Sequence, residues 1–141
     1  MAQLVDTIAE RGNGPLLLLG RLTIAALYLP SGFGKLTNAA GFAGYLASLG
    51  APGPVMLLAW LAGIVEFFGS LAILLGFQTR LAAGALCIFT VIAAFLGHPY
   101  WAAEAAARMG QYYNFWKDIA IAGGLLFLFV HGAGRLSLDR R

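Results

Sequence analysis

The sequence is poor in charge and nearly free of cysteine. Only 11% of its 141 residues are charged, against about 25% in an ordinary soluble domain, whereas 60% are hydrophobic. A soluble fold of this size would leave much of that apolar surface in water, so the composition favours a membrane protein. Cys87 is the only cysteine, which excludes an intramolecular disulfide and the paired-cysteine chemistry of membrane oxidoreductases.

Cofactor and nucleic-acid signatures are also scarce. His98 and His131 are expected near opposite membrane faces, where they cannot ligate one haem iron together, although a haem with a single histidine ligand stays open. No His, Cys, Asp and Glu set has metal-ligand spacing, and no phosphate-binding or nucleophile motif occurs. The net charge of +3 comes mainly from scattered basic residues, which is typical of contact with lipid head groups. We therefore predict no metal site and no nucleic-acid partner.

Long apolar runs are what the sequence has in abundance. A helix needs about 20 mostly apolar residues to cross the hydrocarbon core, and four runs approach that length. The chain has no room for a further module, so we expect one membrane domain over residues 1–141. The predicted fold is all-α, a polytopic antiparallel bundle of four transmembrane helices. The expected spans are about 15–34, 55–76, 79–97 and 115–132.

The links between the spans carry patterns of their own. The second and third spans are joined so closely that they must form an antiparallel hairpin. In the first link, apolar residues share one helical face and a Gly/Pro-rich breaker follows, which predicts a short interfacial helix. The other long link is rich in Tyr and Trp, as an aromatic belt at the membrane boundary is. The helical face consists of Phe42, Tyr45, Leu46 and Leu49, and the belt of Tyr100, Trp101, Tyr112, Tyr113 and Trp116.

Basic residues outside the spans indicate the orientation. With four spans both termini share one side of the membrane, and that side has five basic residues against three on the other. The positive-inside rule then predicts an integral protein of the cytoplasmic (plasma) membrane with both termini in the cytoplasm. The five are Arg11, Arg80, Arg135, Arg140 and Arg141, and the three are Lys35, Arg108 and Lys117.

Arg21 and Glu66 lie inside spans, where a central charge costs roughly 2.5–3.5 kcal/mol and usually faces the bundle interior. Arg21 follows Pro15 by six residues, or about 9 Å, and Glu66 precedes Gly76 by ten, or about 15 Å. These depths predict an Arg21–Glu66 ion pair. The pair could be a structural clamp between helices, or a functional site for a polar head group or a proton relay.

Two further polar groupings are candidate ligand sites. Tyr28 and Lys35 are expected on the same helix face as Arg21, and this polar seam should line protein or water within the membrane. Near the outer face, Lys35, His98 and Lys117 are expected around Asp118, with Asn114 close by. Such a net-positive outer pocket would suit an anion or a quinone. The alternative is that these residues form no common pocket. Asp118 would then be stabilised by the helix dipole in the first turn of its helix, and Lys117 would extend its charge toward the membrane surface.

Short stretches spread over nearly the whole chain match one family of membrane proteins in order and spacing. They are Arg21 with Gly32–Lys35, Gly41–Phe42, Leu49–Pro52, Val65–Glu66 with Gly69, Leu75–Arg80, Asn114–Asp118 with Gly123–Gly124, and Gly134–Asp139. In these stretches the sequence resembles the DoxX family of four-helix membrane proteins. The resemblance implies association with quinone-linked sulfur oxidation, or with a superoxide dismutase and sulfurtransferase complex in thiol-stress defence. It also implies that Arg21, Lys35, Glu66, Asn114 and Lys117 are the polar positions that matter.

Three functions follow as hypotheses. The favoured one is a membrane subunit of a redox or quinone-linked complex, which is non-catalytic, carries no metal or haem and has quinone as its one candidate cofactor. Its partners would be the lipid bilayer and soluble or membrane redox proteins, and a homo-oligomer is allowed. The second is a small-molecule channel or transporter that uses the Arg21–Glu66 seam, although no inverted repeat is visible. The third is a stand-alone quinone oxidoreductase.

Overall fold

The computed structural model describes residues 1–139, without the side chains of residues 8, 9 and 11. Arg140, Arg141 and the Arg11 side chain, which enter the orientation argument, lie outside the described residues. The described chain contains five helices and no strand. They are α1 (Ala2–Thr37), α2 (Ala39–Ser48), α3 (Val55–Leu75), α4 (Thr79–Gly97) and α5 (Ala105–His131).

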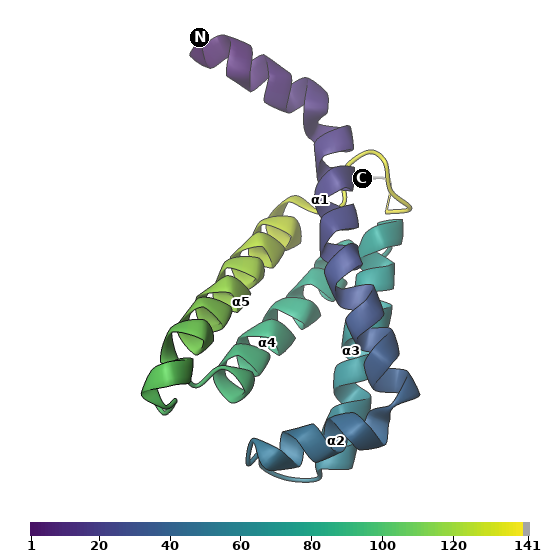
Figure 1. Cartoon of the computed structure of the whole chain (residues 1–141). Helices are drawn as coiled ribbons and strands as arrows, with labels where there is room; N and C mark the ends of the chain where they lie inside the picture. Colours follow the sequence, from purple (N-terminus) through teal and green to yellow (C-terminus); the bar gives the residue numbers. More distant parts are fainter. Residues whose placement is uncertain (140–141) are drawn as a thin grey trace.

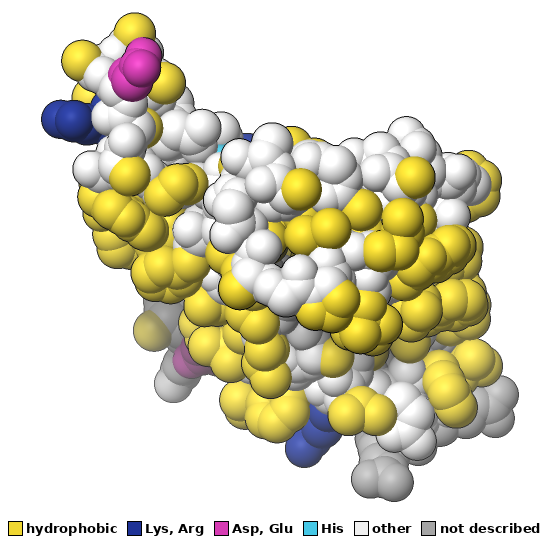
Figure 2. Space-filling view, turned by 90° about the horizontal axis from the view of Figure 1, so that it is seen from below, with side chains coloured by type: hydrophobic (Ala, Val, Ile, Leu, Met, Phe, Trp, Pro, Cys, Tyr) yellow, Lys and Arg dark blue, Asp and Glu magenta, His cyan; other side chains and the backbone are white. Residues whose placement is uncertain are grey.

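Four of these helices are long and apolar enough to cross a membrane, which confirms the predicted all-α fold of four spans. The helices run alternately in opposite directions, with both chain ends and the α3–α4 turn on one side (Figure 1). α2 lies at the opposite side, as the short helix expected in the first link. Hydrophobic side chains cover much of the visible surface, and charged ones occur at few places (Figure 2).

Two helices extend beyond their apolar runs. α1 begins at Ala2 and continues through Pro15 and Pro30, and its N-terminal part is set at an angle to the rest (Figure 1). α5 begins at Ala105, ten residues before the apolar run, because alanine is a strong helix former and residues 105–107 are all alanine. An apolar run marks the part of a helix that can cross the membrane, and not the more polar turns that extend it.

The bundle is built from two packed helix pairs. α1 packs along α3 and α4 along α5, while α3 and α4 join the pairs; α1 and α5 make no close backbone approach within the described chain. A core cluster at this junction contains Ile73, Leu86 and Leu125, each with no exposed surface. A smaller cluster, Ala43, Leu46 and Ala59, fixes α2 on α3.

Glycines set the register between α1 and α3. A Cβ on Gly32 would lie 2.4 Å from the backbone N of Phe67, so the two helices touch there without room for a side chain. Four residues further along α1, Leu36 lies against Gly63, four residues earlier on α3. Small residues of this kind let membrane helices approach closely. The register puts the C-terminal end of α1 level with the middle of α3.

The C-terminal tail, residues 132–139, is hydrogen-bonded to the α3–α4 turn. Leu138 N–H donates to Leu75 O at 3.2 Å, and Asp139 N–H donates to Gly76 O at 2.7 Å. The Asp139 carboxylate accepts from Gln78 N at 2.8 Å and Thr79 N at 2.9 Å. The tail therefore supplies the N-terminal cap of α4, whose own N-cap residue makes no side-chain cap bond.

Candidate functional site

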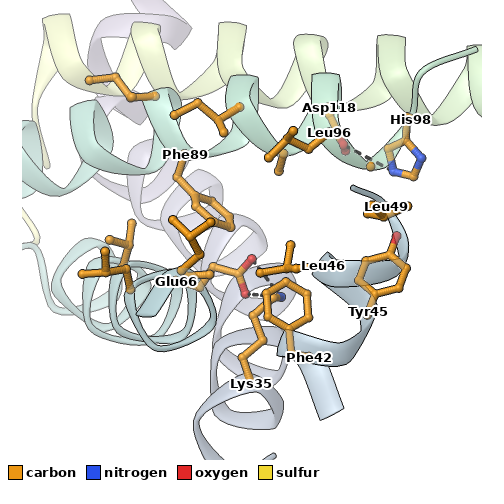
Figure 3. Close-up of a pocket in the computed structure, with 18 of the residues that line it drawn as sticks. Lys35, Phe42, Tyr45, Leu46, Leu49, Glu66, Phe89, Leu96, His98 and Asp118 are labelled. Atoms are coloured by element: carbon orange, nitrogen blue, oxygen red, sulfur yellow. Dashed lines mark hydrogen bonds and ion pairs between the residues drawn. The ribbon is translucent and has the colours of Figure 1, made fainter. Parts of the chain in front are cut away.

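A cavity of about 490 Å³ lies between α2, α3 and α4. Its walls are mostly Leu, Ile, Ala and Phe side chains, with Phe42 on α2 and Phe89 on α4. α1 contributes Lys35 and α5 contributes Asp118. Figure 3 shows two ion pairs on opposite sides of this main cavity, each linking two helices.

Lys35 and Glu66 form the first ion pair. Lys35 Nζ lies 2.8 Å from Glu66 Oε2 and 3.0 Å from Oε1, and it also donates to Ser31 Oγ at 2.7 Å. The ammonium lies 4.8 Å from the centre of the Phe42 ring, within the range of a cation–π contact. The side chains are 16% and 6% exposed, so this bonded pair is largely desolvated. The low local dielectric makes these charged hydrogen bonds electrostatically stronger than those of an ion pair on the surface.

His98 and Asp118 form the second pair. His98 Nε2 lies 3.6 Å from Asp118 Oδ2, and His98 Nδ1 lies 2.7 Å from Gln111 Oε1. With Gln111 Oε1 as the acceptor, Nδ1 carries a proton. Gln111 was not among the predicted site residues, because its place one α5 turn before the apolar run gives no signal in the sequence.

Arg21 does not pair with Glu66, so the predicted Arg21–Glu66 ion pair is wrong. Arg21 is 1% exposed and donates from Nη2 to the carbonyl oxygen of Leu136 in the tail. Its Nη1 lies against Gly76, at the C-terminal end of α3. The α1–α3 register explains the difference, because it places Arg21 near the α3–α4 turn and brings Lys35 to the level of Glu66.

Tyr28 lies between the two charges of the seam and is also buried. Its hydroxyl forms a 2.5 Å hydrogen bond with Thr90 Oγ1 on α4. The three seam residues thus face the interior, but each bonds a different partner and they do not form one continuous network. A smaller cavity of about 160 Å³ is lined by Tyr28, Thr90, Glu66 and Asp118, among others. The sequence reading did not identify Thr90 as a partner.

The predicted outer cluster forms only in part. Of its three basic residues, His98 alone is within ion-pair distance of Asp118 among the described residues. Lys117 is exposed and donates to Asn114 Oδ1 at 3.1 Å, one turn earlier on the same helix. Neither Lys117 nor Asn114 lines a described cavity. Lys35 joins Glu66 instead, because its side chain points to α3.

Metal-ligating residues do not gather in the described part of the chain. No group of three His, Cys, Asp or Glu residues lies close enough to hold a metal ion. His131 bonds the carbonyl oxygen of Phe127 at 3.1 Å on the opposite membrane side from His98. Buried Cys87 is near the carbonyl oxygen of Ala122, at 3.6 Å.

These features define a small polytopic membrane protein whose intramembrane ion pairs line an apolar cavity. A family model described as DoxX matches residues 16–99, and the chain belongs to the DoxX family. This confirms the resemblance inferred from the sequence motifs.

Two curated relatives come from Escherichia coli K12. Inner membrane protein YphA is 40% identical over 126 residues, covering 89% of each chain. Inner membrane protein YqjF is 38% identical over 123 residues, covering 87% of this chain and 88% of the relative. A yeast relative, ER-derived vesicles protein ERV29 of Saccharomyces cerevisiae, is 23% identical over 94% of this chain but only 35% of its own length. No solved structure matches.

Proposed function

We propose that this protein is the membrane subunit of a redox complex and binds a quinone-like ligand in the main cavity. The observation that carries the proposal is the 490 Å³ apolar cavity with an ion pair on each of two facing sides (Figure 3). Small-molecule pockets are usually about 300–1,000 Å³, mostly apolar, with a few polar groups that orient the ligand. The cavity has these properties.

The chemistry of the two pairs suits a quinone ring. A quinone has a flat apolar ring and two carbonyl acceptors on opposite edges. Lys35 Nζ and the His98 ring lie on facing sides of the cavity as polar groups, and Phe42 and Phe89 offer apolar faces to the ring. A ligand with only one polar end would leave one of the two pairs without a ligand contact.

Proton handling also favours this class of ligand. Reduction of a quinone to a quinol takes up two electrons and two protons. Glu66 and Asp118, beside Lys35 and His98 respectively, are the groups positioned to replace those protons. The electrons would come from a redox partner protein, as the family resemblance implies. Under this proposal the chain binds and orients the carrier.

The channel hypothesis has less support. It rested on an Arg21–Glu66 seam through the membrane, and these residues instead bond the tail and Lys35. The cavity is lined mostly by apolar side chains, which offer few partners to a hydrated solute.

A cavity-filling variant tests the proposal. Ala85 lines the main cavity and is exposed, so Ala85→Phe adds bulk there without crowding the core. The matched control is Ala120→Phe, at an exposed alanine on α5 that lines no described cavity. Purified proteins are extracted with solvent, and bound quinone is quantified by liquid chromatography and mass spectrometry. We expect quinone in the wild type and the control, and at least a tenfold loss in Ala85→Phe.

A second variant tests the polar contacts. Lys35→Gln with Glu66→Gln removes both charges together, so no charge is left buried and unpaired. We expect this protein to fold and insert but to retain less quinone. Absence of quinone from the wild type, extracted in mild detergent and supplied with a short-chain quinone, contradicts the proposal. So does equal retention by Ala85→Phe and Ala120→Phe.

A further inference from the structure

A second, more polar cavity lies where two family motifs meet. The α3–α4 turn and the C-terminal tail are about 60 residues apart in the sequence, yet Asp139 bonds both Gln78 and Thr79. A cavity of about 290 Å³ opens between them on the side that carries both chain ends. We call it the tail cavity. Its lining includes Gln78, Thr79, Arg80, His131, Ser137 and Asp139, with the backbone of residues 132–134.

The charges of the tail cavity favour an anion. Arg80 and His131 are its two basic side chains. A Cβ on Gly132 would lie 3.5 Å from Arg80 Nε, so the guanidinium lies beside the tail backbone. The one carboxylate, Asp139, has both oxygens engaged by backbone N–H groups at the start of α4, where the helix dipole offsets its charge.

Several polar groups around the cavity have no hydrogen-bond partner among residues 1–139. Thr79 has no exposed surface, and its Oγ1 makes no hydrogen bond to any described residue. The backbone N–H groups of Ala133 and Gly134 also make no hydrogen bond within residues 1–139. Buried polar groups are nearly always hydrogen-bonded, so unpartnered ones beside a polar cavity point to a bound group.

We infer that the tail cavity binds a phosphate group, with Arg80 as its main contact. A guanidinium binds phosphate oxygens through paired hydrogen bonds, and a hydroxyl and backbone N–H groups complete such a site. The cavity is formed at the start of α4 and the end of α5, where spans meet the head-group layer. This position suits the phosphate of an anionic lipid, and free phosphate has the same chemistry.

The test compares two arginines on the same membrane side. Arg80→Gln removes the cavity guanidinium, whereas Arg135→Gln removes an exposed arginine of the tail that does not line the cavity. Both variants lose one positive charge at an exposed position, so both should fold. Thr79→Val, which keeps the shape and removes the hydroxyl, is the third variant. Each protein is placed in phosphatidylcholine nanodiscs, with or without phosphatidylglycerol, and its unfolding temperature and lipid retention are measured.

We expect phosphatidylglycerol to stabilise the wild type and Arg135→Gln, and its retention to fall about tenfold in Arg80→Gln. Retention of phosphatidylglycerol by Thr79→Val should lie between that of the wild type and that of Arg80→Gln. If inorganic phosphate in phosphatidylcholine discs stabilises the wild type and Arg80→Gln abolishes the effect, the same site takes free phosphate. Equal losses in Arg80→Gln and Arg135→Gln would show general attraction to a charged surface and overturn the inference. So would the absence of any effect of either phosphate source on the wild type.

Discussion

Lys35 and Glu66 are joined across the α1–α3 contact, with Nζ 2.8 Å from Oε2. Phe42 lies over the ammonium and Ser31 Oγ accepts a hydrogen bond from it, so the charges are held in place by their neighbours. The pair lines the main cavity, and it is also next to the close contact between α1 and α3 where Gly32 meets Phe67. The geometry of this ion pair therefore depends on how α1 packs on α3.

The first prediction concerns this ion pair. Lys35→Met or Glu66→Met alone leaves an uncompensated buried charge, so each should lower the free energy of unfolding by roughly 3–5 kcal/mol. The double variant should recover most of that loss, because two apolar side chains replace the pair. Unfolding in mixed detergent micelles, followed by tryptophan fluorescence, measures the coupling in a double-mutant cycle.

The control is the same double-mutant cycle for Arg21 and Glu66, which are not paired in the structure. Arg21→Met and Glu66→Met should each destabilise, but their losses should add to within about 0.5 kcal/mol because the two residues share no partner. Strong coupling between positions 21 and 66, together with none between 35 and 66, would contradict the register described above.

The sequence predicted the fold well and the contacts within it less well. The lengths of the apolar runs are enough to predict four spans, and the spacing of Phe42, Tyr45, Leu46 and Leu49 predicted a helix where α2 occurs. These features depend on local composition and periodicity. The tail's attachment to the α3–α4 turn depends on the complete fold. The motifs Leu75–Arg80 and Gly134–Asp139 mark the two segments but do not indicate that they bind each other.

The error about Arg21 has a simple geometric cause. Counting the depth of Arg21 from Pro15 and that of Glu66 from Gly76 treats Pro15 and Gly76 as level with each other. In the structure Arg21 itself lies against Gly76. The reference point was therefore wrong by about six residues, or about 9 Å along the helix. Which residues of two helices are level depends on where small residues let them touch, and the sequence alone does not give that.

The second prediction concerns orientation in the membrane. The excess of basic residues beside the termini predicts that this side is cytoplasmic. In a Cys87→Ala background, Ala106→Cys should react with a membrane-impermeant maleimide added to intact cells, and Leu138→Cys should react only after the cells are opened. Both positions are exposed, so access to reagent depends on the side of the membrane. The reverse pattern would place both termini outside.

The third prediction separates backbone strain from crowding at Gly76. Gly76 has a φ of 66° and Gly50 a φ of 70°, and alanine in this left-handed region costs about 1–2 kcal/mol. A Cβ on Gly50 meets nothing within 4 Å, whereas one on Gly76 would lie 2.0 Å from Arg21 Nη1 and 2.3 Å from Ser137 Cβ. Gly76→Ala should therefore destabilise more than Gly50→Ala, by a further 1–3 kcal/mol or so.

The measurement for Gly76 is hydrogen exchange together with unfolding. Gly76→Ala should speed exchange of the Leu138 and Asp139 amides, because the added methyl group displaces the tail from the turn that they bond. Gly50→Ala should leave these amides unchanged. Equal stability losses and unchanged amides in both variants would mean that the tail does not pack on Arg21 and Gly76 as described.

The fourth prediction compares two glycines of α1 that are two residues apart. A Cβ on Gly32 would lie 2.4 Å from the backbone N of Phe67, whereas one on Gly34 meets nothing within 4 Å. Gly32→Ala must push α1 away from α3 and should cost about 1–3 kcal/mol, as overpacking does. Gly34→Ala faces open space and should stabilise the helix by up to about 1 kcal/mol, because alanine is the better helix former.

The same two variants also test whether close packing supports the cavity. Gly32 precedes Lys35 by one helical turn, and Phe67 follows Glu66, so a shift of α1 at Gly32 lengthens the Lys35–Glu66 contact. Gly32→Ala should then lose bound quinone as well as stability, while Gly34→Ala keeps both. Unfolding and quinone content are measured on the same preparations. Two variants of equal stability would refute the close α1–α3 contact, and a destabilised Gly32→Ala that keeps wild-type quinone would show that the ion pair does not hold the ligand.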